Sequence, residues 1–310
     1  MKPKVIISAS AQICRIGLTF SSYHNCAEGA GERPAPKGRM RIPWAHYLSE
    51  FAGTALLIAA GLSVVIFDFG QGSPMLVWLP GAALRRLVTG FLFGTIGALI
   101  AISLVGKISG AHINPAVTLA FWVKGKMRGR DAAGYVIAQC AGATTGALPL
   151  VLWGAMGRSV EFAATFPGPS GDGAALAGEL ATTFIMVTGL FFFIGHSRLR
   201  RFTPLMFPFL YAVMVWLEAP ISGTSTNPAR SFGPSLVAVA WRGWWIYWLG
   251  PIAGALAAAC AHEFTWLKRF EFDVAKVYHF THDPRGVFHR GAEGPSPLAR
   301  FFKRRSQAGK

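Results

Sequence analysis

Six long apolar segments are the feature that most restricts how this chain can fold. Each contains close to the ~20 apolar residues that an α-helix needs to cross the hydrocarbon core of a bilayer. Charged residues make up only 14% of the sequence and hydrophobic residues 52%, whereas soluble domains carry roughly 25% charged residues. We therefore predict an all-α membrane protein and exclude an ordinary soluble enzyme. The predicted membrane-spanning segments are residues 45–68, 84–106, 131–154, 175–196, 203–221 and 243–266.

Basic residues gather in the two ends of the chain and in a few connecting segments. The sequence has 30 Lys and Arg against 14 Asp and Glu, a formal net charge of +16. Positive clusters between apolar spans follow the positive-inside rule, so they do not indicate a nucleic-acid-binding face. They predict cytoplasmic termini in a multi-pass protein of the cell membrane, with Arg85, Arg86 and Arg242 at the outer interface. The predicted cytoplasmic cluster comprises Lys107, Lys124, Lys126, Arg128, Arg130, Arg198, Arg200, Arg201, Lys268, Arg269, Lys303, Arg304 and Arg305.

Two basic tails flank the apolar spans. Residues 1–43 are polar, basic and rich in Gly and Pro, and such a stretch contains too little apolar surface to order itself. We predict that this tail is disordered. Met40 is an alternative start of translation, because every recognisable feature of the sequence follows it. Residues 268–310 form the second basic tail, which leaves residues 44–267 as one membrane domain.

The sequence of the membrane domain repeats itself once. Glu50–Thr54 (Glu-Phe-Ala-Gly-Thr) matches Glu179–Thr183 (Glu-Leu-Ala-Thr-Thr), and Ser109–Ala116 matches Ser222–Ala229. Each half contains three predicted spans. Because three is odd, the second half must be inverted relative to the first, and inverted repeats place their shared site near the membrane midplane. Repeat one covers about residues 44–154 and repeat two about residues 173–267.

Two further apolar segments, residues 114–123 and 227–237, are too short to span. Each begins with Asn-Pro-Ala, and Asn is a favoured N-cap while Pro is a favoured first helical residue. We predict two re-entrant half-helices, which membranes tolerate where protein or a water-filled cavity surrounds the irregular backbone. The inverted symmetry would bring their starts, Asn114 and Asn227, together at the midplane.

The two Asn amides predict what the centre of such a pore admits. An Asn oxygen can cap a backbone N–H while its NH₂ group still donates outward, and each helix N-terminus acts like roughly half a positive elementary charge. Water at this point accepts from both Asn residues and donates to neither, which interrupts a chain of proton transfer. Cations meet positive dipoles and lose hydration. We predict a passive channel for water, and for small uncharged solutes such as glycerol and urea, that excludes protons and ions.

These motifs together resemble the aquaporin, or major intrinsic protein, family. The resemblance rests on Ser109–Thr118, Asn227–Pro234 and the two Glu-x-x-x-Thr starts, and it covers about residues 44–267. It implies a homotetramer in the lipid bilayer with one pore per subunit, and no cofactor or metal ion. The pore motifs that it implies are Asn114, Pro115, Ala116, Asn227, Pro228 and Ala229.

In this family a constriction outside the paired motifs selects solutes. Counting without gaps from the motifs places its four residues at Gly94, Val215, Thr224 and Arg230. Water-selective members have an aromatic residue and His at the first two positions, so Gly94 and Val215 would make the ring wider and less polar. If the register slips by one residue, Phe93 takes the first position and the ring narrows again. The sequence leaves both registers open.

Glu50 and Glu179 are carboxylates within apolar spans, where a charge is costly unless it is partnered. We interpret them as acceptors for backbone N–H groups of the re-entrant loops, since a proton relay would need titratable partners that the spans do not show. Two other classes of protein fit the pattern: an inverted-repeat secondary transporter, and a structural membrane protein with a closed pore. An enzyme is not indicated, because no nucleophile–base pair or cluster of metal ligands is visible.

Overall fold

The computed structural model describes residues 43–272, 274–278 and 296–301. The chain divides into two units, residues 1–42 and 43–310, and all described residues belong to the second. The predicted disordered tail, together with the alternative start at Met40, therefore lies outside the described residues except for Pro43. Within the described residues the regular secondary structure is helical, without strands.

Six long helices correspond to the six predicted spans, so the prediction of an all-α membrane fold is confirmed. Five of them are long and apolar enough to cross a membrane, by length and composition. The sixth, α11, has 19 residues and ends in the polar pair His262–Glu263, which lowers its hydropathy. The six are α1 (Trp44–Phe69), α3 (Ala82–Ile102), α6 (Gly129–Ala147), α8 (Gly171–Gly195), α9 (Thr203–Ser222) and α11 (Ile246–Phe264).

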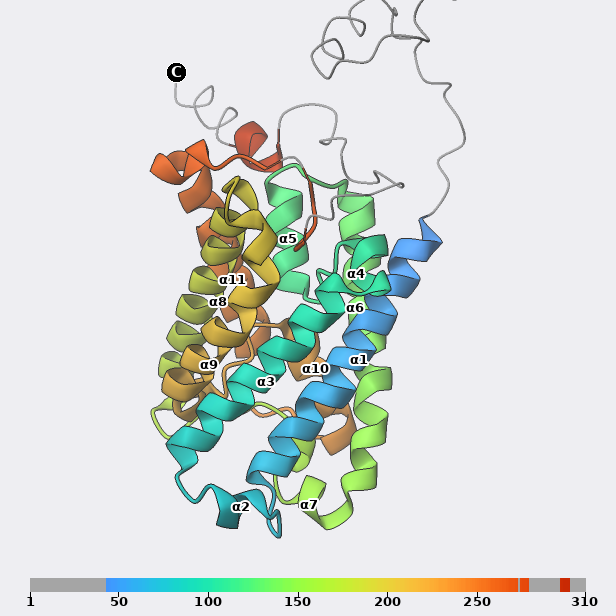
Figure 1. Cartoon of the computed structure of the whole chain (residues 1–310), viewed down its shortest axis with the longest axis vertical. Coiled ribbons are helices and arrows are strands. Elements are labelled where there is room, and N and C mark those ends of the chain that lie inside the picture. Colours follow the sequence, from blue (N-terminus) through green and yellow to red (C-terminus); the bar gives the residue numbers. More distant parts are fainter. Residues whose placement is uncertain (1–42, 273, 279–295, 302–310) are drawn as a thin grey trace, which may run out of the picture. The chain divides into compact units, whose positions relative to one another are not determined.

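Short helical pieces connect these long helices. Figure 1 shows α2 and α7 at one end of the bundle, opposite the end at which α11 leads into the C-terminal residues. The chain order thus alternates between the two ends, as a multi-pass protein requires. The short pieces are α2 (Met75–Trp78), α7 (Gly154–Arg158) and the 3-10 helices Leu148–Trp153, Glu161–Ala163, Arg200–Phe202 and Trp266–Arg269.

The second predicted span, residues 84–106, is interrupted. α3 ends at Ile102, Ser103 has an extended conformation, and α4 (Leu104–Ser109) starts directly after it. The Ser103 hydroxyl accepts a hydrogen bond from the Val105 N–H at 3.2 Å, as Ser does at N-caps. The helical phase restarts at this break. Counting residues across it therefore does not predict which face of α3 a side chain occupies.

The two half-helices form where the paired motifs predict them. α5 (Pro115–Val123) has 9 residues and α10 (Pro228–Ala238) has 11, so neither is long enough to cross a bilayer. Figure 1 shows α5 in the upper part of the bundle and α10 in the lower part, with the long helices around them. This arrangement of two three-helix repeats, each with one half-helix, is the predicted inverted topology.

Glycine residues let the long helices approach until their backbones touch. A Cβ atom added to Gly142 of α6 would overlap the Phe51 carbonyl oxygen of α1, and one added to Gly254 of α11 would overlap the Leu180 carbonyl oxygen of α8. These two helix pairs are equivalent in the inverted repeat. The α3–α9 pair, with one helix from each repeat, uses Gly90 in the same way. Small residues at crossings are typical of membrane helices.

The outward faces of the bundle are apolar. Each of the six long helices exposes at least one large hydrophobic side chain, whereas polar and charged side chains are buried inside. A bilayer supplies the contact that such faces lack in water, which agrees with the low content of charged residues. Examples are Leu56 of α1, Leu99 of α3, Ile137 of α6, Ile185 of α8, Phe209 of α9 and Leu249 of α11.

Several residues shortly after the predicted boundary at residue 268 are buried. Phe272, Val274, Ala275, Lys276 and Val277 are all buried against the helices. Composition alone suggested a basic tail, because Lys and Arg outnumber acidic residues over 268–310. The apolar side chains within that basic stretch are buried because they occupy space that the helices leave between them.

Candidate pore and selectivity elements

The half-helix α5 is capped by Asn114 and α10 by Asn227. The Asn114 Oδ1 atom accepts a hydrogen bond from the Ala116 N–H at 2.8 Å. The Asn227 Oδ1 atom accepts from the N–H groups of Ala229 and Arg230 at 3.0 and 3.3 Å. Both Asn residues have extended backbones, followed by Pro at the first helical position, which is the N-cap geometry that the sequence predicts.

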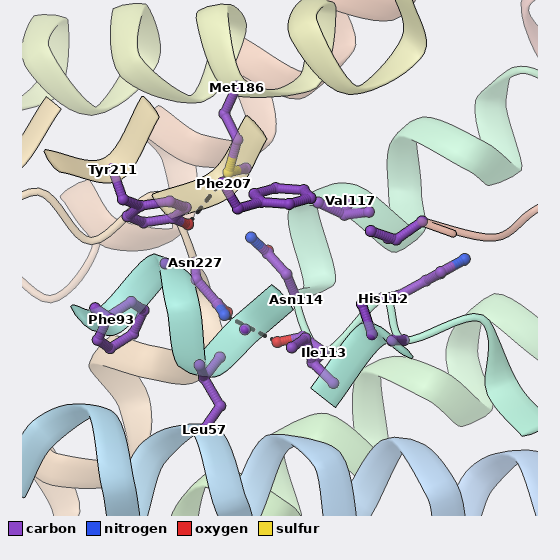
Figure 2. A pocket seen from close by; sticks show the side chains of 15 residues that line it. Leu57, Phe93, His112, Ile113, Asn114, Val117, Met186, Phe207, Tyr211 and Asn227 are labelled. Atoms are coloured by element: carbon purple, nitrogen blue, oxygen red, sulfur yellow. Dashed lines mark hydrogen bonds between the residues drawn. The ribbon is translucent and has the colours of Figure 1, made fainter. Parts of the chain in front are cut away.

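The two amides also bond across the repeat interface. Asn114 Nδ2 donates to the Thr226 carbonyl oxygen, and Asn227 Nδ2 donates to the Ile113 carbonyl oxygen, both at 2.9 Å. Figure 2 shows the two Asn side chains next to each other in a cavity, with the second of these bonds drawn. An amide NH₂ has two hydrogens. Each cross-bond uses one of them and leaves the other for a molecule in the cavity.

Glu50 holds the loop that precedes α5. Its two carboxylate oxygens accept hydrogen bonds from the backbone N–H groups of His112 at 3.0 Å and Ile113 at 2.7 Å. Gln139 Nε2 adds a third bond at 2.7 Å. Hydrogen bonds to a carboxylate are about twice as strong as bonds between neutral groups. They hold Ile113 at φ 41°, a backbone conformation that a β-branched residue rarely adopts.

Glu179 holds the loop that precedes α10 in the second repeat. Its oxygens accept from the backbone N–H groups of Ser225 at 2.6 Å and Thr226 at 2.7 Å. The Ser222 hydroxyl donates to the same carboxylate at 2.7 Å. Thr226 has a φ of 52°, which matches the strained conformation of Ile113. Both carboxylates are fully buried and bonded to loop backbone, as the sequence analysis expected of them.

An inner cavity of about 50 Å³ contains the Asn pair in its wall. A water molecule needs roughly 10–15 Å³ of such volume, so this cavity can hold a short row of waters. Apolar side chains form most of the remaining wall, among them Val117, Phe207 and Val277. The cavity therefore presents a few hydrogen-bonding groups, concentrated at the Asn pair, within apolar surroundings.

A second, outer cavity of about 290 Å³ is lined by Val215, Thr224 and Arg230. Arg230 Nη1 donates to the Ala163 carbonyl oxygen at 3.0 Å, which fixes the guanidinium in the wall. The Thr224 hydroxyl is buried away from the cavity space, beside the carboxyl group of Glu218. Three of the four residues expected in the constriction thus line one cavity.

The fourth expected residue, Gly94, is not in that wall. A Cβ atom added to Gly94 would lie 2.5 Å from the Phe207 carbonyl oxygen, so this face of α3 packs against the backbone of α9. Gly94 lines the inner cavity only. The gapless count was misleading because it ran through the break at Ser103, where the helical phase restarts. In this structure Phe93, and not Gly94, lines the outer cavity.

Phe93 and Tyr211 lie between the two cavities and line both. Their ring centroids are 5.7 Å apart, and the Tyr211 hydroxyl is 2.8 Å from the Thr226 hydroxyl. Figure 2 shows both rings on the same side of the Asn pair. Gly61 of α1 makes room for Phe93, because a Cβ atom there would lie 2.6 Å from the ring. The register shifted by one residue predicts Phe93 in the pore wall, whereas no feature of the sequence indicates Tyr211.

His112 bonds within its loop and to the C-terminal residues. Its Nδ1 atom is 3.1 Å from the Thr118 hydroxyl, and its Nε2 atom is 2.9 Å from the Ala275 carbonyl oxygen. A carbonyl only accepts, so Nε2 carries the proton and Nδ1 accepts from Thr118. The sequence does not predict Ala275 as a partner of His112. No motif pointed to that residue.

Comparison with known proteins agrees with this geometry. The profile of the major intrinsic protein family matches residues 39–262. Aquaporin NIP1-4 of Oryza sativa subsp. japonica is 35% identical over 222 residues, which cover 70% of this chain and 75% of that protein. Aquaporin AqpM of Methanothermobacter marburgensis is 32% identical over 235 residues, which cover 70% and 95%.

The fold also matches a solved structure. The X-ray structure of the aquaglyceroporin from Plasmodium falciparum aligns with a TM-score of 0.61, covering 74% of this chain and 99% of that chain at 19% sequence identity. At this identity the match concerns the fold alone.

Two inverted three-helix repeats, with half-helices that meet at paired Asn caps in the wall of a cavity, define a helical membrane channel. The profile match spans most of the chain, and the identities to two aquaporins exceed 30% over most of their length. The chain belongs to the major intrinsic protein family.

Proposed function

We propose that this protein is a passive channel for water and small uncharged solutes that excludes protons and cations. The observation that carries the proposal is the reciprocal bonding of Asn114 and Asn227. Each amide is held by its own helix and by the opposite loop, so both remaining N–H groups are fixed in the wall of one cavity. A water molecule at this point accepts from the pair and turns its own hydrogens away along the pore.

Positive electrostatic potential supports the exclusion of cations. The N-termini of α5 and α10 meet at the Asn pair, and each contributes the positive end of a helix dipole. Arg86 and Arg230 line the outer cavity, so a cation that enters from that side meets two guanidinium groups first. Among the described residues, no carboxylate lines either cavity to replace its lost hydration. A neutral solute experiences none of these penalties.

The constriction that we propose consists of Phe93, Val215, Thr224 and Arg230, with Tyr211 directly inside it. Arg230 supplies a polar group on one side, while Phe93 and Val215 are apolar on the other. Such an amphipathic ring admits water readily. Its polar side can hydrogen-bond to one face of a small polyol or amide, and its apolar side contacts the other face. We expect water to pass fastest and glycerol and urea more slowly.

The membrane context belongs to the same proposal. Both termini and the connections after α3 and α8 carry most of the positive charge, which favours the cytoplasmic side. The protein is then a multi-pass protein of the cell membrane. Relatives named aquaporins and the exposed apolar helix faces support a homotetramer in which each subunit has its own pore.

Stopped-flow light scattering on proteoliposomes tests the proposal. Liposomes that contain the purified protein should shrink faster than empty ones under an osmotic gradient. The flux should rise linearly with the gradient, and a pH-sensitive dye inside should report no added proton leak. Saturating solute flux coupled to an ion gradient would identify a secondary transporter instead. Water flux equal to that of empty liposomes would identify a structural protein with a closed pore.

A further inference from the structure

After α11 and the 3-10 helix Trp266–Arg269, the chain turns back into the bundle. Figure 1 shows this red part of the ribbon entering between α5 and α4. We call the described residues 270–272 and 274–278 the C-terminal segment. Most of its side chains from Phe272 on are buried, with Ala275 at 0% and Lys276 at 1% exposure.

One end of the segment is anchored by Phe272 in an aromatic pocket. The ring lies 4.8 Å from Phe191 of α8, 5.8 Å from Phe121 of α5 and 5.5 Å from His262 of α11, measured between centroids. Only 4% of Phe272 is exposed. Just before it, Phe270 lies with its carbonyl group against Gly195, where any side chain would overlap it. Two elements of repeat two and one of repeat one thus form a socket for this residue.

The other end is bonded to the loop that precedes α5. The Val277 N–H donates to the Gly110 carbonyl oxygen at 2.9 Å, and His112 Nε2 donates to the Ala275 carbonyl oxygen at 2.9 Å. A Cβ atom added to Gly110 would lie 2.7 Å from that same Ala275 oxygen. Glycine is needed here both for its φ of 88° and for this close approach.

These two anchors place the segment beside the inner cavity. Phe272 contacts α8 and α11 of repeat two and α5 of repeat one, whereas Val277 bonds to the loop of repeat one. Val277 is also part of the wall of the inner cavity, together with Asn114 and Asn227. The segment therefore lies against both repeats at this cavity. It adds an apolar side chain to the water path at that point.

We infer that the mouth of the inner cavity is a binding site for an extended peptide, that its occupant is the chain's own C-terminal segment, and that docking of this segment closes the pore. This inference rests on the proposed channel function. It assigns a chemical class to the site: an apolar peptide with an aromatic residue for the socket and a backbone that bonds to Gly110 and His112.

Docking at this site is suited to reversal. The contacts of the segment are opposed by the conformational entropy that it loses when it is ordered. Burial disfavours the charge of Lys276 and lowers its pKa to about 8, which also opposes docking. Local opening of a chain end requires less free energy than unfolding of the helices against which it packs.

Truncation gives the direct test. A chain that ends after Arg269 lacks the segment, and one that ends after Tyr278 keeps it but lacks the rest of the tail. In proteoliposomes matched for protein content, water flux through the first should be several-fold higher than through the full chain. Flux through the second should equal that of the full chain. A synthetic peptide with the sequence of residues 270–278, applied on the side of the truncated end, should reduce the flux of the shorter chain again.

Point variants keep the test decisive if the shorter chain folds poorly. Phe272→Ala empties the aromatic socket and should raise flux, whereas Phe301→Ala, at a side chain that is 58% exposed, should not. The same Phe272→Ala change in the peptide should abolish inhibition. Equal flux through the full chain, the Arg269 truncation and Phe272→Ala would overturn the inference but leave the channel intact. If none of them conducts above empty liposomes, the proposed function fails, and the inference with it.

Discussion

Asn114 and Asn227 each donate a hydrogen bond to the carbonyl group that precedes the other, at 2.9 Å in both directions. This reciprocity joins the two halves of an inverted repeat at a single point. Each Asn caps its own half-helix with its oxygen and bonds to the opposite loop with its nitrogen. The selectivity that we propose for the pore depends on both atoms, because one positions the side chain and the other provides the donor.

Exchange of either nitrogen for oxygen tests this arrangement. Asn114→Asp and Asn227→Asp keep the capping acceptor but place a carboxylate oxygen against a carbonyl oxygen. Loss of the partner of a buried carbonyl costs about 1–3 kcal/mol, and the new negative charge removes the barrier to cations. We expect lower thermal stability of the purified protein and an added cation or proton leak in proteoliposomes. Wild-type stability together with wild-type proton exclusion would contradict the role assigned to the pair.

Substitution of Gly94 should lower stability through helix packing alone. Gly94→Ala should destabilise the protein by about 1–3 kcal/mol, the range for overpacked interiors, because the new methyl group meets the backbone of α9. Gly97→Ala, three residues further along the same helix, is the matched control. Its Cβ atom would have only Leu57 nearby, at 3.9 Å. Thermal unfolding in detergent should separate the two variants, and equal melting temperatures would argue against close contact of α3 and α9 at Gly94.

Removal of the Phe93 ring should change the selectivity of the pore among solutes. Phe93→Ala should raise the ratio of glycerol or urea flux to water flux several-fold, because the ring stands between the outer cavity and the Asn pair. Phe91→Ala on the same helix is the control, since Phe91 is 37% exposed and lines neither cavity. Stopped-flow measurements with the three solutes give the ratios. An unchanged ratio in a well-folded Phe93→Ala variant would remove Phe93 from the constriction.

Much of the fold could be predicted from the sequence, because its signals are local. Each long helix follows from a stretch of apolar residues that only lipid or protein can surround. Asn114 and Asn227 predict helix starts, because the Asn side chain is a favoured N-cap and Pro follows it at the first helical position. The repeat could be read by comparing Glu50 with Glu179 and one Asn-Pro-Ala with the other. The hydrogen bonds of both carboxylates to loop N–H groups follow from the cost of an unpartnered charge in an apolar span.

The tertiary structure decided what depends on contacts between distant segments. Phe93 rather than Gly94 faces the outer cavity, because the break at Ser103 resets a helical phase that residue counting cannot follow. Tyr211 enters the pore wall only through the packing of α9 against α3. The composition of the residues after Arg269 predicts a charged tail. Phe272 and Val277 are nevertheless buried, because three helices and a loop leave a space between them that these side chains fill. Local sequence determines which segments form helices, but the space left between helices exists only once all of them are packed.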